Sequence, residues 1–152
     1  MRILVDTSIL VRLVRGPDDA HFEVTVAALE MLRSRRDVPV VVPQNLYEFW
    51  VVATRPVENN GLGLSPQEAN DELTAFGTPL FRRLLDERGI LPHWQDVVVA
   101  NSVRGKLAHD ARLVAAMYRH GITTLLTLNS ADFARFSGIT AMTPHQVVGE
   151  SP

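Results

Sequence analysis

Hydrophobic residues in this chain occur in two alternating patterns, short continuous runs and longer segments with helical spacing. Residues 3–5, 38–42 and 123–128 are short runs that are mostly β-branched or leucine and carry no charge. Such runs are typical of strands buried on both faces of a parallel sheet. Residues 139–142 and 81–86 are weaker strand candidates, the second of which also fits a helix extension. The pattern predicts a sheet of four to five strands.

The segments between these runs have apolar residues three and four positions apart, as in a helix that packs one face on a core. One helix has Asp110 in its first turn and ends at Gly121, where a left-handed residue is favoured. Another starts at Ser65, where Ser-Pro-Gln-Glu combines a serine cap with a glutamate that reaches back. We expect the remaining helices at residues 9–14, 18–36, 44–53, 91–103 and 130–136.

Strands that alternate with helices predict right-handed crossovers and helices on both faces of a mostly parallel sheet. We therefore expect a three-layer α/β/α sandwich. The 152 residues are enough for one substantial core and too few for two comfortable ones. We expect a single domain that spans residues 1–152.

The composition is that of an ordinary globular protein, with 46% hydrophobic and 21% charged residues. The absence of cysteine excludes disulfides and thiolate metal sites, and it fits a cytoplasmic protein. No apolar run is long enough to cross a membrane, so we expect no membrane association. The net charge of −2 provides no overall attraction to nucleic acid, so any phosphate binding must be local.

Four carboxylates are expected to meet at one edge of the sheet. Asp6 directly follows the first strand, and Glu48 lies in the first turns of the helix after the second. A helix that leads into a parallel strand begins at the carboxyl edge of the sheet, where ligands bind in open α/β folds. Asp110 begins such a helix at that edge, and Asp132 lies just beyond the strand that follows it.

Each acid also has an ordinary structural interpretation. Asp6 is a candidate helix cap, Glu48 a candidate solvated residue, Asp110 is favoured by the helix dipole, and Asp132 is a candidate cap. Together, however, four carboxylates repel one another unless a cation neutralises them. Oxygen ligands select Mg²⁺ or Mn²⁺, and metal-bound water is a source of hydroxide for cleaving a phosphodiester. We therefore predict metal-dependent phosphodiester hydrolysis.

Basic residues accompany these acids in the sequence and predict contacts to a nucleic-acid backbone. The alternative for any one of them is a cation scattered on a solvated surface. The candidates are Arg12, Arg104, Lys106 and Arg112.

Four motifs carry a family resemblance and occur in the family's order. They are Val5-Asp6-Thr7-Ser8, Leu46-Tyr47-Glu48-Phe49, His109-Asp110-Ala111-Arg112-Leu113 and Thr127-Leu128-Asn129-Ser130-Ala131-Asp132-Phe133. Over nearly its whole length the chain resembles the PIN-domain nucleases, specifically the VapC toxins of bacterial and archaeal toxin–antitoxin pairs. The resemblance implies that the expected three-layer sandwich has a PIN-like fold.

The resemblance implies an endoribonuclease that depends on Mg²⁺, for which Mn²⁺ substitutes. Its acidic set would be Asp6, Glu48, Asp110 and Asp132, with Asp6 and Asp110 as the direct metal ligands. Thr7 or Ser8 and Asn129 would be supporting polar groups, with the division of roles between Asn129 and Asp132 left open. The number of metal ions is also left open.

The same resemblance implies three partners: an RNA substrate, an inhibitory VapB-type antitoxin and a second copy of the chain in a homodimer. We expect the antitoxin to cover apolar residues near the first two helices, among them Leu10, Leu13 and Val14. We also expect its tail to insert a basic side chain among the acids.

Two other functions compete with this one. A haloacid-dehalogenase-like phosphatase also has an aspartate after its first strand, but it requires a second acid two residues later, where this chain has Ser8. A catalytically inactive PIN-like binding domain would keep the fold without the chemistry. Metal-dependent cleavage of RNA distinguishes the ribonuclease from both alternatives.

Overall fold

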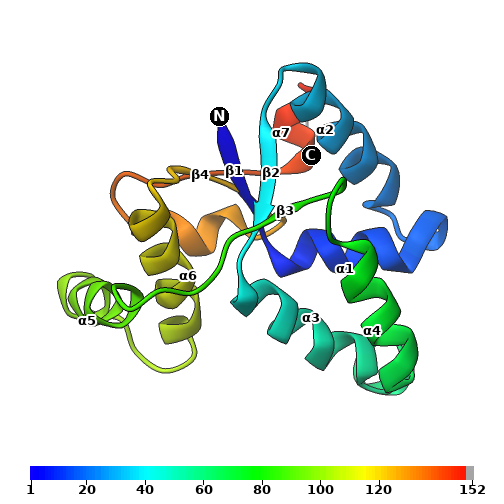
Figure 1. Cartoon of the computed structure of the whole chain (residues 1–152), viewed down its shortest axis with the longest axis horizontal. Helices are drawn as coiled ribbons and strands as arrows, with labels where there is room; N and C mark the ends of the chain where they lie inside the picture. Colours follow the sequence, from blue (N-terminus) through cyan, green and yellow to red (C-terminus); the bar gives the residue numbers. More distant parts are fainter. Residues whose placement is uncertain (150–152) are drawn as a thin grey trace.

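The computed structural model describes residues 1–149, at the centre of which lies a parallel sheet (Figure 1). Its strands are β1 (Arg2–Val5), β2 (Val38–Val41), β3 (Arg82–Arg83), β4 (Thr124–Leu126) and β5 (Thr140–Met142). They lie in the order β3-β2-β1-β4-β5, and every neighbouring pair is parallel. The predicted sheet is confirmed, including the ambiguous strand at residues 81–86, of which two residues pair.

Side chains of the strands alternate between two hydrophobic clusters because successive residues of a strand point to opposite faces. Ile3 and Val5 belong to one cluster and Leu4 to the other. One face is covered by α1 (Thr7–Arg15), α2 (Phe22–Ser34), α3 (Pro43–Thr54), α4 (Pro66–Ala75) and α7 (Pro144–Val148). The opposite face is covered by α5 (Ile90–Ala100) and α6 (Leu107–His120), drawn at the left of Figure 1. The three-layer architecture is therefore confirmed.

Most helix ends follow the local signals. Gly121 has φ 65°, and its N–H donates to the carbonyls of Met117 and Tyr118, which ends α6 as predicted. At α4, Ser65 Oγ accepts the N–H of Glu68 while the Glu68 carboxylate accepts the N–H of Ser65, the reciprocal cap that the sequence predicts.

Several boundaries differ from the prediction. The helix expected from residue 18 begins at Phe22, because the chain first makes a 3₁₀ turn at Gly16–Asp18. The helix expected to reach residue 103 ends at Ala100, just before Ser102 adopts a left-handed φ of 51°. The helical piece expected at residues 130–136 is a 3₁₀ turn, Ser130–Phe133. α1 begins two residues earlier than expected, which places Thr7 and Ser8 in its first turn.

Candidate functional site

The site is built where β1 and β4 end side by side. Val5 pairs with Leu126, and the next backbone N–H, that of Asp6, donates to the Leu126 carbonyl at 2.9 Å. This register brings Asp6 next to Thr127, whose hydroxyl donates to Asp6 Oδ2 at 2.8 Å. The pairing of β1 with β4 therefore fixes the first acid of the site.

The Asp6 carboxylate does not act as a helix cap, although Asp6 occupies the cap position of α1. Its Oδ2 accepts hydrogen bonds from Ser8 Oγ at 2.7 Å and from Thr127. Ser8 Oγ in turn accepts the backbone N–H of Leu128 at 3.2 Å, which ties the start of α1 to the segment after β4. Within residues 1–149, Asp6 Oδ1 accepts no hydrogen bond. The capping interpretation of Asp6 is wrong, and one of its oxygens is available to a ligand.

Glu48 is held by two donors and is not a solvated surface residue. Its Oε2 accepts from Thr7 Oγ1 at 3.0 Å, and its Oε1 accepts from Gln44 Nε2 at 2.8 Å. Gln44 and Glu48 lie one turn apart on α3, so they share a face of that helix. The threonine and serine that follow Asp6 thus serve different acids, Thr7 serving Glu48 and Ser8 serving Asp6.

Gln44 connects Glu48 to α6. Only 6% of Gln44 is exposed, and its Nε2 also donates to the backbone carbonyl of His109 at 2.8 Å. Its Oε1 accepts from Arg112 Nη1 at 3.0 Å, and Arg112 Nη2 lies 3.2 Å from Asp86 Oδ2. A buried amide with every polar atom paired is rigid. The sequence prediction missed Gln44, for which the only signal was its spacing of one helical turn from Glu48.

Asp110 lies in the first turn of α6, and its pKa is raised from 3.8 to about 6. Burial is the largest cause, followed by the negative charges of Asp132, Asp6 and Glu48, while His109 acts in the opposite direction. The structure therefore brings the four predicted acids close enough to influence one another. Within residues 1–149, the Asp110 carboxylate accepts no hydrogen bond.

Asp132 and Asn129 lie on the exposed side of this group. Asp132 is exposed on the 3₁₀ turn Ser130–Phe133. Asn129 is also exposed, and its backbone N–H donates to Thr127 Oγ1 at 3.1 Å. Asn129 thus contributes a backbone contact to the site, through the same hydroxyl that donates to Asp6.

The donor set fits a hard divalent cation, because it consists of carboxylate and hydroxyl oxygens without sulfur. Among residues 1–149, no three acidic or histidine side chains stand close enough to enclose a metal by themselves. A cation bound here would therefore keep several water ligands, which is the usual state of protein-bound Mg²⁺. The uncompensated charge around Asp110 is the feature that such an ion would neutralise.

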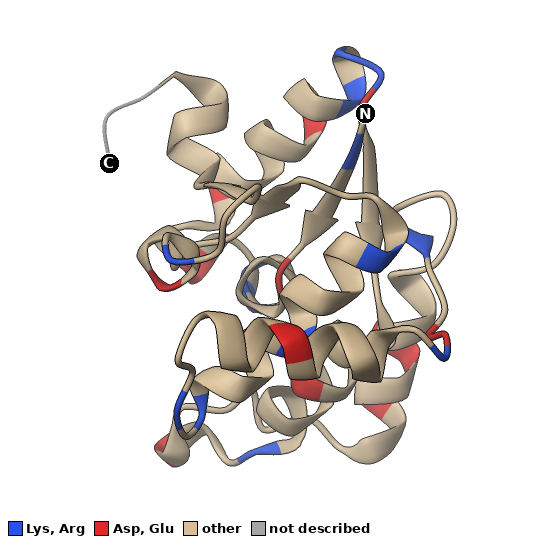
Figure 2. Cartoon of the chain, turned by 90° about the vertical axis from the view of Figure 1, so that its left-hand side faces the viewer, with Lys and Arg blue, Asp and Glu red and all other residues tan. Residues whose placement is uncertain are grey.

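The predicted basic residues lie in different settings. Arg12 pairs with Asp19 at 2.9 Å, and Arg112 is engaged by Gln44 and Asp86. Arg104 and Lys106 are exposed in the segment that precedes α6. Figure 2 shows acidic and basic residues interspersed over the elements instead of segregated on one face. Attraction to a polyanion must therefore come from local groups.

The chain belongs to the PIN-domain family, since the family's model, described as "PIN domain", matches residues 3–139. It is 34% identical over 110 residues to ribonuclease VapC48 of Mycobacterium tuberculosis, an alignment that covers 67% of this chain and 74% of that protein. The resemblance to PIN-domain proteins of the VapC type is confirmed.

Solved structures share the fold. VapBC2 from Rickettsia felis, bound to a promoter DNA fragment, superposes with a TM-score of 0.69 at 14% identity, covering 94% of this chain and 98% of that one. Mycobacterium tuberculosis VapC20, described as a sarcin–ricin loop cleaving toxin, superposes with a TM-score of 0.59 at 18% identity, covering 81% and 86%.

Proposed function

We propose that this protein is a divalent-metal-dependent endoribonuclease and the toxin of a toxin–antitoxin pair. The observation that carries the proposal is the group of four carboxylates at the carboxyl edge of a PIN-domain sheet, where three of them raise the pKa of the fourth. The relatives agree with it, because VapC48 is named a ribonuclease and VapC20 a cleaving toxin. A cluster of this charge is stabilised by a cation and suits phosphodiester hydrolysis.

In this proposal, Asp6 and Asp110 would hold Mg²⁺ or Mn²⁺. When bound, the ion supplies positive charge that polarises the phosphate and lowers the pKa of a bound water. Glu48 would orient the attacking water or accept its proton at a carboxylate oxygen, since Thr7 and Gln44 fix the carboxylate while each oxygen keeps a free lone pair. Asp132 would supply a further carboxylate on the exposed side, and Arg104 and Lys106 would contact the RNA backbone.

The test is cleavage of a panel of structured RNAs and messenger RNAs with mapped ends, with Mg²⁺, Mn²⁺ or EDTA. We expect cleavage only with a divalent ion. Hydrolysis of p-nitrophenyl phosphate without RNA cleavage would favour the phosphatase, and binding without cleavage would favour an inactive domain. Ser8 already argues against the phosphatase, because its hydroxyl donates to Asp6 at the position where that chemistry requires an acid.

We propose that the antitoxin docks in a groove of this chain beside α1. This groove has a volume of about 650 Å³ and includes Val14, Val57, Leu62 and Leu64 in its lining. Leu10 is fully buried, so the expectation that it forms part of the surface is wrong. The Rickettsia felis structure contains a VapBC pair, which supports a protein partner. Co-expression with the product of an adjacent small reading frame should abolish cleavage.

Self-association is supported by Tyr47 and Val51, which are exposed apolar residues one turn apart on α3. We propose a homodimer through this face, for which Tyr47→Glu should shift the sedimentation of the protein toward the monomer. No helix among residues 1–149 is long and apolar enough to cross a membrane. We propose a cytoplasmic location, to be tested by cell fractionation.

A further inference from the structure

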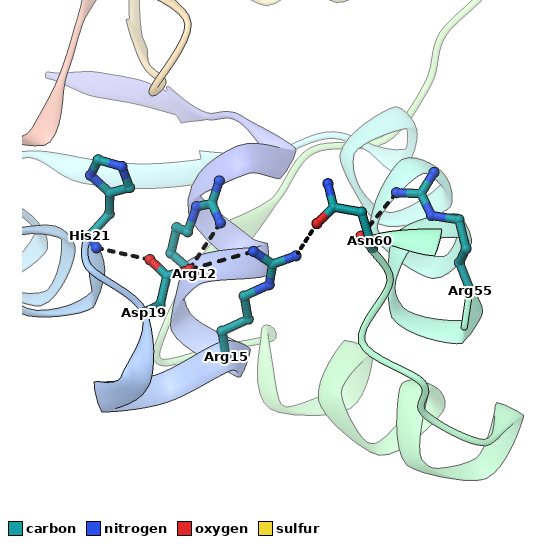
Figure 3. Close-up of polar contacts among 6 residues, drawn as sticks. All are labelled: Arg12, Arg15, Asp19, His21, Arg55 and Asn60. Carbon is teal, nitrogen blue, oxygen red and sulfur yellow. Dashed lines mark hydrogen bonds and ion pairs between the residues drawn. The ribbon is translucent and has the colours of Figure 1, made fainter. Parts of the chain in front are cut away.

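A small pocket of about 210 Å³ opens directly beside the acids, between α1 and the end of α3. Thr7 and Ser8, the two residues that hold Glu48 and Asp6, form part of its lining. Arg12, Arg15 and Arg55 line it as well. Figure 3 shows Arg12 and Arg15 beside Asp19, and Arg15 and Arg55 beside Asn60.

Positive charge in this cluster exceeds negative charge. Arg12 and Arg15 share one carboxylate, that of Asp19, at 2.9 and 3.6 Å. Asp19 also accepts the backbone N–H of His21 at 2.8 Å. Burial raises the pKa of Asp19, but this hydrogen bond and the two arginines outweigh it and leave the pKa below 3.8. The cluster thus contains three guanidinium groups and one carboxylate, which Arg12 and Arg15 share, and Arg55 makes no ion pair among the described residues.

Neutral oxygens hold the arginines at the pocket. Arg15 Nη2 donates to Asn60 Oδ1 at 3.2 Å, and Arg55 Nη2 donates to the Asn60 carbonyl at 3.4 Å. Within residues 1–149, Nε of Arg12 and Nε of Arg55 are buried and have no hydrogen-bond acceptor. Unpaired buried donors are costly, and a charged acceptor would relieve that cost. Asn60 therefore keeps Arg15 and Arg55 in place without neutralising them.

We propose that this pocket binds a backbone phosphate of the RNA strand, next to the phosphate that is cleaved. The inference rests on the ribonuclease function proposed above and adds a subsite to it. A phosphodiester is always ionised and offers two oxygens, which match the fork of a guanidinium group. Thr7 and Ser8 line the pocket and donate to Glu48 and Asp6, so a phosphate bound here lies next to the acids. Because the whole chain is acidic, this local charge is what attracts the polyanion.

The experiment measures binding of a labelled, mixed-sequence, single-stranded RNA in EDTA, where no cleavage occurs, at several salt concentrations. Arg55→Gln removes a charge whose only hydrogen bond among the described residues is the long one to the Asn60 carbonyl. Asn60→Asp keeps every arginine but places a carboxylate between Arg15 and Arg55. We expect both variants to bind several-fold more weakly. The slope of log affinity against log salt should fall by about 0.7 in magnitude for each lost single-strand phosphate contact.

Arg33→Gln is the matched control, because Arg33 is exposed on α2 and donates to the Leu80 carbonyl, away from this pocket. It should leave the slope unchanged, and circular dichroism checks the folding of each variant. Wild-type slopes in both Arg55→Gln and Asn60→Asp would overturn the phosphate subsite while leaving the ribonuclease intact.

A different outcome points to a protein ligand instead. If both variants bind RNA normally but lose affinity for the antitoxin, the pocket accepts a carboxylate and the RNA proposal is overturned. If the wild-type protein neither binds nor cleaves any RNA, the proposed function fails and the subsite fails with it.

Discussion

The two halves of the acidic site are held in opposite ways. Asp6 and Glu48, on the side of β1 and α3, each accept two hydrogen bonds from neighbouring side chains. Asp110, at the start of α6, accepts none from residues 1–149, and its pKa is raised to about 6. One half is positioned by hydrogen bonds, whereas the other is positioned by the packing of its helix.

The difference follows from what surrounds each carboxyl group. Donated hydrogen bonds hold the oxygens of Asp6 and Glu48 in fixed directions. Burial and neighbouring negative charges favour the neutral form of Asp110. The second half carries the electrostatic cost of the site, and that cost is what a bound cation would remove.

The largest expected effect comes from neutralising the fixed half. Asp6→Asn keeps the size of the side chain but removes a charge that the proposed cation would require, so cleavage should fall by orders of magnitude while the fold persists. Asp132→Asn, on the exposed 3₁₀ turn, should cost only roughly 10–100-fold, if Asp132 supports the ion indirectly as proposed. Rates on one RNA at saturating Mg²⁺, with circular dichroism as the folding control, give the comparison. Equal losses of cleavage rate in the two variants would contradict the distinction between Asp6 as a direct ligand and Asp132 as an indirect one.

The next effect tests the link between the halves. Gln44→Ala removes the amide that joins Glu48 to the His109 carbonyl and to Arg112, so we expect cleavage to fall roughly 10–100-fold. The matched control is Gln67→Ala, since Gln67 makes a similar helical contact, to Asp71, on the exposed surface of α4. Single-turnover rates with each variant separate the chemical step from RNA binding. A wild-type rate in Gln44→Ala would mean that Thr7 alone suffices to position Glu48.

Local pattern determined most of what could be predicted about the fold. Residues 3–5 and 123–128 lie in the neighbouring strands β1 and β4 because uncharged β-branched and leucine runs have few alternatives, although β4 itself spans only Thr124–Leu126. The meeting of the four acids could also be predicted, because topology alone places the ends of parallel strands and the starts of the helices leading into them at one edge.

The partners of the acids could not be predicted in the same way. Thr127 reaches Asp6 only because β1 and β4 pair in one particular register, across 121 positions of sequence. Gln44 acquires its role from contacts to His109 and Arg112, which are set by how α3 and α6 pack. The late start of α2 depends on the 3₁₀ turn at Gly16–Asp18, which the spacing of hydrophobic residues does not predict. Long-range packing supplies these details.

The smallest expected effect concerns the stability of the metal-free protein. Because the pKa of Asp110 is raised from 3.8 to about 6, the folded state favours its protonated form. The favourable contribution of the protonated Asp110 to the free energy of unfolding is fully present below pH 3.8. It is lost as the pH rises through about 6. At pH 7 the ionised group should therefore cost on the order of 1–2 kcal/mol, after allowance for its partial exposure to solvent.

Asp110→Asn should accordingly raise the melting temperature of the metal-free protein at pH 7, by roughly 2–6 °C for this cost in a chain of this size. The two proteins should converge as the pH falls to 4 and below, because Asp110 is then protonated in the folded state and becomes increasingly protonated in the unfolded state as well. Millimolar Mn²⁺ should raise the melting temperature of the wild type, because a ligand that binds only the folded state stabilises it, and should raise that of Asp110→Asn less. Thermal melts at pH 4 and pH 7, with and without Mn²⁺, measure all three. A pH-independent difference between the proteins, or a wild-type melt indifferent to Mn²⁺, would show that the α6 half of the site does not carry the electrostatic cost.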